Sequence, residues 1–172
     1  MTLKKFILHQ LCEMQREVTA VLRGLSPEQL SARPPGQKNH IAWIVQHCCI
    51  NVDALLHRST TGRFAISHTD RFVDWPTSPP EDGEQFPDAD ALLDRWTRVT
   101  EAGIAAIASL DEAQLLQPGQ VYGEEPIVQS CLRVINHQNA HLRQIWMVLG
   151  GLGLSDKRWP TQETWLAHED QA

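Results

Sequence analysis

Apolar side chains recur every three to four positions along four long stretches of this chain. The stretches span about residues 3–25, 39–58, 88–109 and 125–149. This spacing places the apolar side chains on one face of an α-helix, the face that a helix buries against its neighbours. In the first stretch these positions are Phe6, Ile7, Leu11, Met14, Val18, Val21, Leu22 and Leu25. The pattern therefore predicts an all-α fold with four long helices.

Capping residues separate the long helices from short helical turns. Ser26-Pro-Glu-Gln29 supplies an N-cap, a proline at the first helical position and a glutamine at the third, which together form a capping box. Pro34-Pro35-Gly36 ends the turn that follows. Residues 110–115 and the break at Pro118-Gly119 echo this arrangement before the last long helix. The echo is either a weak internal repeat of two helical hairpins or a pair of independent capped turns.

The segment between the second and third helices is long for a compact bundle and lacks helical periodicity. It spans residues 59–87, and glycines and prolines punctuate it. We expect it to cross over between helices that are not hairpin neighbours, anchored by Phe64, Phe72 and Trp75. Asp88 is placed to cap the third helix.

The length of 172 residues suits one domain with a sizeable core, and we expect residues 1–172 to form a single helical domain. The tail, residues 154–172, carries Trp159 and Trp165. We expect this tail either to pack back on the bundle or to contribute to a dimer contact.

Charge and hydropathy narrow the range of partners. The formal net charge is −6, and no Lys/Arg run occurs, which argues against nucleic acid and anionic membrane surfaces. No apolar run reaches the roughly 20 residues that span a bilayer. The apolar N-terminal stretch is interrupted by His9, Gln10 and Glu13, which argues against a signal peptide.

The four cysteines show no CxxC spacing. Cys48 and Cys49 are neighbours in a helical pattern, while Cys12 and Cys131 lie in other helices. We expect reduced, mostly buried thiols, as in a cytoplasmic protein.

Two histidines one helical turn apart are the main candidates for chemistry. His137 and His141 lie in the fourth helix, where a four-residue step brings the second imidazole nearly over the first. Such a pair can hold one metal ion, but two ligands rarely suffice. His47, near the edge of the apolar face of the second helix, is the best candidate for a third ligand. Three protein ligands leave a position open for water or substrate, as in catalytic rather than structural sites.

A metal-free interpretation of these histidines stays open. A histidine pair on a helix often only borders the core, and a lone histidine is often a partly buried residue with ordinary partners. Neither histidine-bearing helix contains a Glu-x-x-His pair, which disfavours a carboxylate-rich di-iron site. The cysteines lie on apolar helix faces, where thiols tend to be inert. Asp53, Glu124 and Glu125 are interpreted as helix-surface or helix-start charges, so the catalytic acid or base stays unknown.

These motifs occur in a particular order along the chain. Leu-Ser-Pro-Glu-Gln-Leu precedes Arg-Pro-Pro-Gly, then comes Ile41-Ala-Trp-Ile-Val-Gln-His47, and later His137-x-x-x-His141-Leu-Arg-Gln-Ile145. Each motif is loose by itself, whereas their order and spacing together are more specific. The pattern resembles the DinB-like superfamily of metal-binding four-helix bundles, and the likeness covers nearly the whole chain.

The resemblance implies an up-down-down-up four-helix bundle, with the long crossover between helices two and three. It implies one divalent metal ion (zinc, nickel or iron) held by His47, His137 and His141, and a homodimer as a common state. Relatives in this superfamily include bacillithiol transferases and the mycothiol-dependent maleylpyruvate isomerase. We therefore expect a metal-dependent low-molecular-weight thiol S-transferase, or a related hydrolase or isomerase, that acts on a small molecule.

Four further residues border the predicted site. Trp43 and Trp146 are candidate walls of a substrate pocket, although packing in the core is the simpler role for both. Asn51 and Gln144 are candidates to orient the ligands. Two alternatives remain: a metal-binding protein without turnover, or a metal-free dimeric bundle whose histidines pair with polar neighbours such as Asn136 or Asn51.

Overall fold

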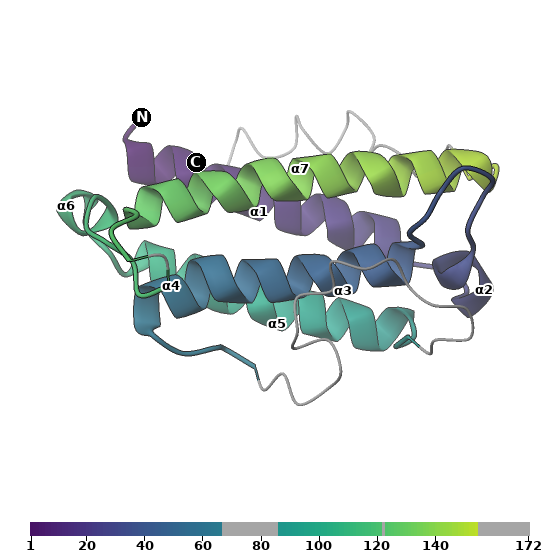
Figure 1. Cartoon of the computed structure of the whole chain (residues 1–172), viewed down its shortest axis with the longest axis horizontal. Coiled ribbons are helices and arrows are strands. Elements are labelled where there is room, and N and C mark those ends of the chain that lie inside the picture. The colour runs from purple at the N-terminus through teal and green to yellow at the C-terminus, as the bar shows by residue number, and fades with distance from the viewer. Residues whose placement is uncertain (67–85, 122, 155–172) are drawn as a thin grey trace, which may run out of the picture.

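A computed structural model describes residues 1–66, 86–121 and 123–154 of the chain (Figure 1). Within these residues the regular structure is helical, apart from an isolated bridge between Pro118 and Pro126. The predicted all-α class is confirmed. No helix in this part of the chain has the length and apolar character needed to cross a membrane.

Most of the predicted crossover and of the predicted tail lies outside the described residues. The same holds for Phe72 and Trp75, two of the three predicted anchors of the crossover, and for Trp159 and Trp165 of the tail. Phe64, at the start of the crossover, is described and is 38% exposed. The guanidinium of Arg58 lies 4.7 Å from the centroid of its ring. Phe64 therefore packs under a cation at the surface rather than in the core.

The first helix, α1 (Leu3–Leu22), buries an apolar face of the predicted kind but ends earlier than predicted. The reason is local, because Gly24 has a positive φ of 73° and Ser26 then starts a short helix, α2 (Pro27–Ser31). Ser26 and Gln29 form the predicted capping box. The turn between α1 and α2 thus follows from side-chain bonding to the first amides of α2.

The second long helix is not regular to its end. Every residue of α3 (Ile41–Val52) except His47 is buried. A π-helix, η1 (Asp53–Arg58), and a short α4 (Ser59–Thr61) continue it. The helix predicted over residues 39–58 is therefore present and continues to Thr61, but after Val52 it changes from an α-helix to a π-helix. The apolar pattern does not reveal the wider turns of a π-helix here. The first four residues of η1 are all buried, so no periodic alternation of buried and exposed positions marks the change.

Asp53 opens the π-helix and is fully buried, so the prediction of a surface charge at this position is wrong. Its carboxylate accepts hydrogen bonds from the backbone amides of Ala65 and Ile66, at 2.8 and 3.3 Å. Burial of a carboxylate is costly unless donors of this kind replace the lost water. Asp53 therefore ties the start of the crossover to the end of α3.

The second half of the described chain agrees closely with the pattern. The side chain of Asp88 caps α5 (Ala89–Ala108), as predicted. The short α6 (Glu112–Leu115) has a capping box that starts at Asp111. The last helix, α7 (Ile127–Gly151), begins and ends within two residues of its predicted limits. Both short helices thus have the same capped form, and each precedes a histidine-bearing helix.

The long helices lie side by side (Figure 1), and hydrogen bonds near their ends give their directions. Nζ of Lys4, at the start of α1, donates to the carbonyl oxygens of Ala108 and Leu110 at the end of α5. The amide of Gln120, just before α7, donates to the carbonyl oxygen of Ser59 in α4. Helices α1 and α5 therefore run in opposite directions, and so do α3 and α7.

The core lies between these four long helices. Trp96 of α5 is fully buried, and its indole Nε1 donates to the carbonyl oxygen of Gln15 in α1. Gly103 of α5 faces Leu56 of η1, where a Cβ on the glycine would come within 2.9 Å of the leucine Cβ. A larger residue at 103 would push the π-helix away from α5. This packing holds α3 and its continuation in place, with α7 beside it.

Candidate metal site

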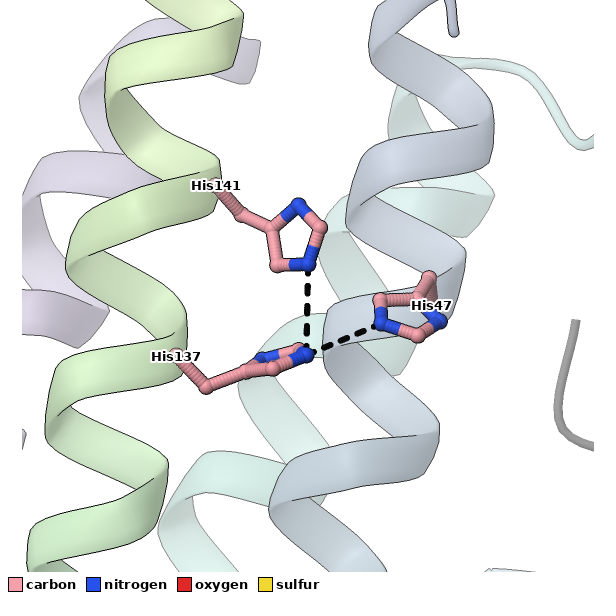
Figure 2. A group of neighbouring side chains, drawn as sticks. All are labelled: His47, His137 and His141. Atoms are coloured by element: carbon pink, nitrogen blue, oxygen red, sulfur yellow. Dashed lines mark hydrogen bonds between the residues drawn. The ribbon is translucent and has the colours of Figure 1, made fainter. Parts of the chain in front are cut away.

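Three histidines from two helices converge between α3 and α7 (Figure 2). The Nε2 atoms of His47 and His137 are 2.9 Å apart, and those of His137 and His141 are 3.2 Å apart. One ring nitrogen from each histidine lies within 4.8 Å of the others. These are the three residues predicted as ligands, and they are close enough to bind one metal ion.

Helix geometry accounts for this convergence. His137 and His141 are one turn apart on α7, and their rings meet edge to face with centroids 4.3 Å apart. His47 projects from α3 toward both of them, and it is the one residue of that helix that is not fully buried. The antiparallel course of α3 and α7 thus brings one imidazole from the first helix against two from the second.

The hydrogen-bonding groups of the three histidines conflict with one another. Gln144 Oε1 lies 2.9 Å from Nδ1 of His141, so this nitrogen donates, and Nε2 of His141 presents a lone pair. His137 must then carry its proton on Nε2 to donate to His141. The Nε2 atom of His47 then either accepts this same proton from His137, which is already shared with His141, or carries a proton of its own that points at it. A divalent cation would remove the conflict by accepting a lone pair from each ring.

Burial keeps two of the imidazoles neutral. It lowers the pKa of His137 to about 3, and the neighbouring His141 and His47 lower it as well. Burial also lowers the pKa of His141, while the hydrogen bond with Gln144 acts in the opposite direction. The neutral imidazole is the form that binds a metal ion. Both rings are therefore ready to act as ligands near neutral pH.

Two of the four predicted neighbours contact the histidines. Gln144 holds His141, as described above, and the indole of Trp43 stacks on the ring of His47 with centroids 5.1 Å apart and planes 4° apart. Asn51 is buried one turn after His47 on α3. Trp146 is partly buried and packs against the core. A role for these side chains in a substrate pocket stays a prediction.

The ligand set fits a divalent transition-metal ion. Among the described residues it consists of the three imidazoles, with no carboxylate or thiolate beside them. Three neutral imidazoles suit zinc, nickel or iron and leave at least one coordination position open. The site can therefore hold an ion together with one exchangeable ligand, such as water or a thiol.

The roles of two buried polar residues of the ligand-bearing segments, His40 and Gln138, did not follow from the sequence. His40 caps α3, because its Nδ1 accepts a hydrogen bond from the amide of Trp43 at 3.1 Å. Gln138, between the two ligands on α7, is buried and donates from Nε2 to the carbonyl oxygen of Cys48. A sequence signal exists for Gln138, since it falls in phase with the apolar positions of its helix. A polar residue at such a position indicates a buried hydrogen bond.

Comparison with known proteins adds a family to this geometry. A family model described as the DinB superfamily matches residues 10–145. This range is most of the chain, and it contains all three histidines. No curated protein and no solved structure matches the chain. The family resemblance inferred from the order of the motifs is confirmed.

Proposed function

Since the chain belongs to the DinB superfamily, we propose that it is a divalent-metal-dependent enzyme that transfers a low-molecular-weight thiol to a small electrophile. The observation that carries the proposal is the convergence of three imidazole nitrogens from two helices. Neutral ligands on rigid helices, with a position left open, are the features of a catalytic metal site. A closed structural site would need a fourth protein ligand.

The chemistry would come from the bound ion. A zinc, nickel or iron ion held by the three histidines would lower the pKa of a thiol or water bound to it. In the overall reaction the thiol loses its proton, and its sulfur forms a bond to the electrophilic carbon. The leaving group departs with the electron pair of the broken bond and takes up a proton. With water in place of the thiol, the same balance describes a hydrolysis.

The protein's own residues would hold and orient this site. Gln144 fixes the proton of His141 on Nδ1, which leaves Nε2 free to act as a ligand. Trp43 holds the ring plane of His47 by stacking on it. Asn51, buried one turn after His47, would help to orient the ligands through its amide, and Trp146 would form an apolar wall. We further propose a homodimer that works in the cytoplasm, which the resemblance and the free, mostly buried cysteines support.

The first experiment measures the metal content of the purified protein by plasma mass spectrometry. Wild type, His47→Ala and His141→Ala are compared, with His9→Ala as the matched control because His9 is exposed on α1. We expect about one ion per chain in wild type and the control, and strong loss in both site variants, since two ligands rarely suffice. Metal-loaded protein is then assayed with glutathione, bacillithiol and mycothiol against several electrophiles.

The two stages separate the parts of the proposal. Wild-type protein without metal, even after reconstitution with zinc and nickel, would rule out a metal-dependent enzyme. Metal-loaded protein that consumes none of the thiols would rule out the transferase and leave a metal-binding protein. Thiol consumption that is lost in His47→Ala and retained in His9→Ala would support the whole proposal.

A further inference from the structure

Gln138 joins the two ligand-bearing helices at the level of the metal site. It directly follows the ligand His137 on α7, and its side chain is only 2% exposed. Its amide nitrogen donates to the backbone carbonyl oxygen of Cys48 at 3.3 Å. Cys48 directly follows the ligand His47 on α3. The hydrogen bond therefore links the residue after one ligand to the residue after another.

This hydrogen bond crosses the interface between α3 and α7, the same interface that a metal ion bound by the three histidines would span. His47 comes from α3 and the other two ligands from α7, so a shift of one helix along the other would separate them. Metal sites need their ligands within about 0.5 Å of the productive geometry. A backbone carbonyl of α3 moves only with its helix, so the hydrogen bond from Gln138 holds the helix itself. Apolar packing along the same interface is less directional than this hydrogen bond.

Stability alone gives little reason for an amide at this position. Only the nitrogen of the Gln138 amide has a hydrogen-bond partner within the described residues, and its Oε1 is buried without one. The gain from one buried hydrogen bond is largely offset by the unpaired oxygen. An apolar side chain of similar volume would pack there without that cost. The effect that remains is on the register of the two helices.

We propose that Gln138 is a positioning residue, which fixes the register of α3 against α7 so that His47, His137 and His141 meet on one metal ion. This inference rests on the metal site of the proposed function. It assigns to Gln138 no contact with the ion or the substrate. Its consequence is that loss of the amide weakens metal binding without a matching loss of stability.

The test compares Gln138→Met, which keeps the volume and removes the amide, with two controls. Gln129→Met makes the same change at an exposed position of α7. Thr100→Val removes a buried hydroxyl from α5, where it bonds within its own helix to Trp96. Three quantities are measured: urea unfolding of the metal-free protein, zinc affinity by competition with a chromophoric chelator, and the visible absorption spectrum of the Co²⁺-loaded protein.

For Gln138→Met we expect metal-free stability close to wild type, zinc affinity lowered about 10-fold or more, and a changed Co²⁺ spectrum. Both controls should keep the wild-type zinc affinity and spectrum, even where Thr100→Val unfolds at lower urea. Gln138→Leu serves for the same measurements if the methionine variant does not fold.

The possible failures are distinguishable. Wild-type protein that binds neither Zn²⁺ nor Co²⁺ would overturn the metal site and this inference together. Wild-type binding that Gln138→Met retains, with the same affinity and spectrum, would overturn only the role of Gln138. Equal losses of affinity in Gln138→Met and Thr100→Val would also overturn it, because metal binding would then follow stability rather than register.

Discussion

Gln144 fixes the proton and the orientation of one of the three histidines. Its Oε1 accepts a hydrogen bond from Nδ1–H of His141, with 2.9 Å between the two atoms, which directs the Nε2 lone pair toward His137. Without this bond the ring of His141 is free to turn and to carry its proton on Nε2. We therefore expect Gln144→Met to lower zinc affinity about 10-fold or more, as measured by competition with a chelator.

The matched control is Arg143→Met, which changes the neighbouring exposed residue of α7. It should bind zinc as wild type does. Equal affinities for Gln144→Met and wild type would show that the orientation of His141 does not depend on Gln144.

The buried imidazoles make the stability of the metal-free protein depend on pH. Burial, chiefly, lowers the pKa of His137 from 6.5 to about 3. Between these values the unfolded chain binds a proton that the folded protein does not, so acid favours unfolding. We expect the contribution of His137 to the free energy of unfolding to be at its maximum above about pH 6.5 and to decrease as the pH falls toward 3. Urea titrations of the chelator-treated protein at several pH values measure this decrease.

A variant assigns the decrease to the site. His137→Phe removes the titrating ring, so its stability should depend less on pH between about 6.5 and 5, above the range where most carboxylates titrate. Some dependence should remain, because burial lowers the pKa of His141 as well. If His137→Phe kept the full pH dependence of wild-type stability, the titrating group responsible for it would lie elsewhere in the protein.

At the scale of elements, the π-helix η1 matters because it starts with a buried carboxylate. Asp53 accepts hydrogen bonds from the backbone amides of Ala65 and Ile66 and so joins η1 to the start of the crossover. Asp53→Ala would leave both amides without this acceptor. We expect a loss of about 2 kcal/mol or more in the free energy of unfolding, measured with urea.

Asp94→Asn is the control for this change, since Asp94 is exposed on α5 and pairs there with exposed Arg98. Its effect should stay below about 0.5 kcal/mol. Hydrogen exchange supplies a local measure. The amides of Ala65 and Ile66 should exchange faster in Asp53→Ala than in wild type, and unchanged exchange would show that Asp53 does not hold this segment.

How far sequence predicts these elements depends on the range of the interactions behind them. The limits of α5 and α7 follow from apolar spacing and from neighbouring residues such as Asp88, all of which are local. The π-helix does not follow in this way. Its Leu56 packs against Gly103, which comes from another part of the chain. The burial of Asp53 likewise depends on partners twelve and thirteen residues away.

The site shows the same division. The pairing of His137 with His141 is local to one helix, so its spacing is visible in the sequence. Placing His47 opposite them needs the packing of α3 on α7. The sequence indicates this packing only by the position of His47 at the edge of an apolar helix face and by the resemblance to a family. The role of Gln138 depends on a carbonyl of another helix. When the partner of a side chain is a distant backbone atom, the sequence shows only that the residue lies in phase with the apolar positions of its helix.

At the scale of the whole molecule, a site shared by two helices couples metal binding to folding. The ligands come together only when α3 and α7 are packed, so the ion binds the folded state far better than the unfolded chain. At an ion concentration 100 times the dissociation constant, the added stability is about 2.7 kcal/mol. For a domain of this size we expect the melting temperature to rise by roughly 5–10 °C with zinc or nickel.

Scanning calorimetry with and without the ion tests this coupling. His47→Ala should lose most of the increase, because it removes the ligand that joins α3 to α7, whereas His9→Ala should retain it. A melting temperature that is independent of zinc and nickel in wild type, or that rises equally in His47→Ala, would show that the three histidines do not tie the two helices together through a metal ion.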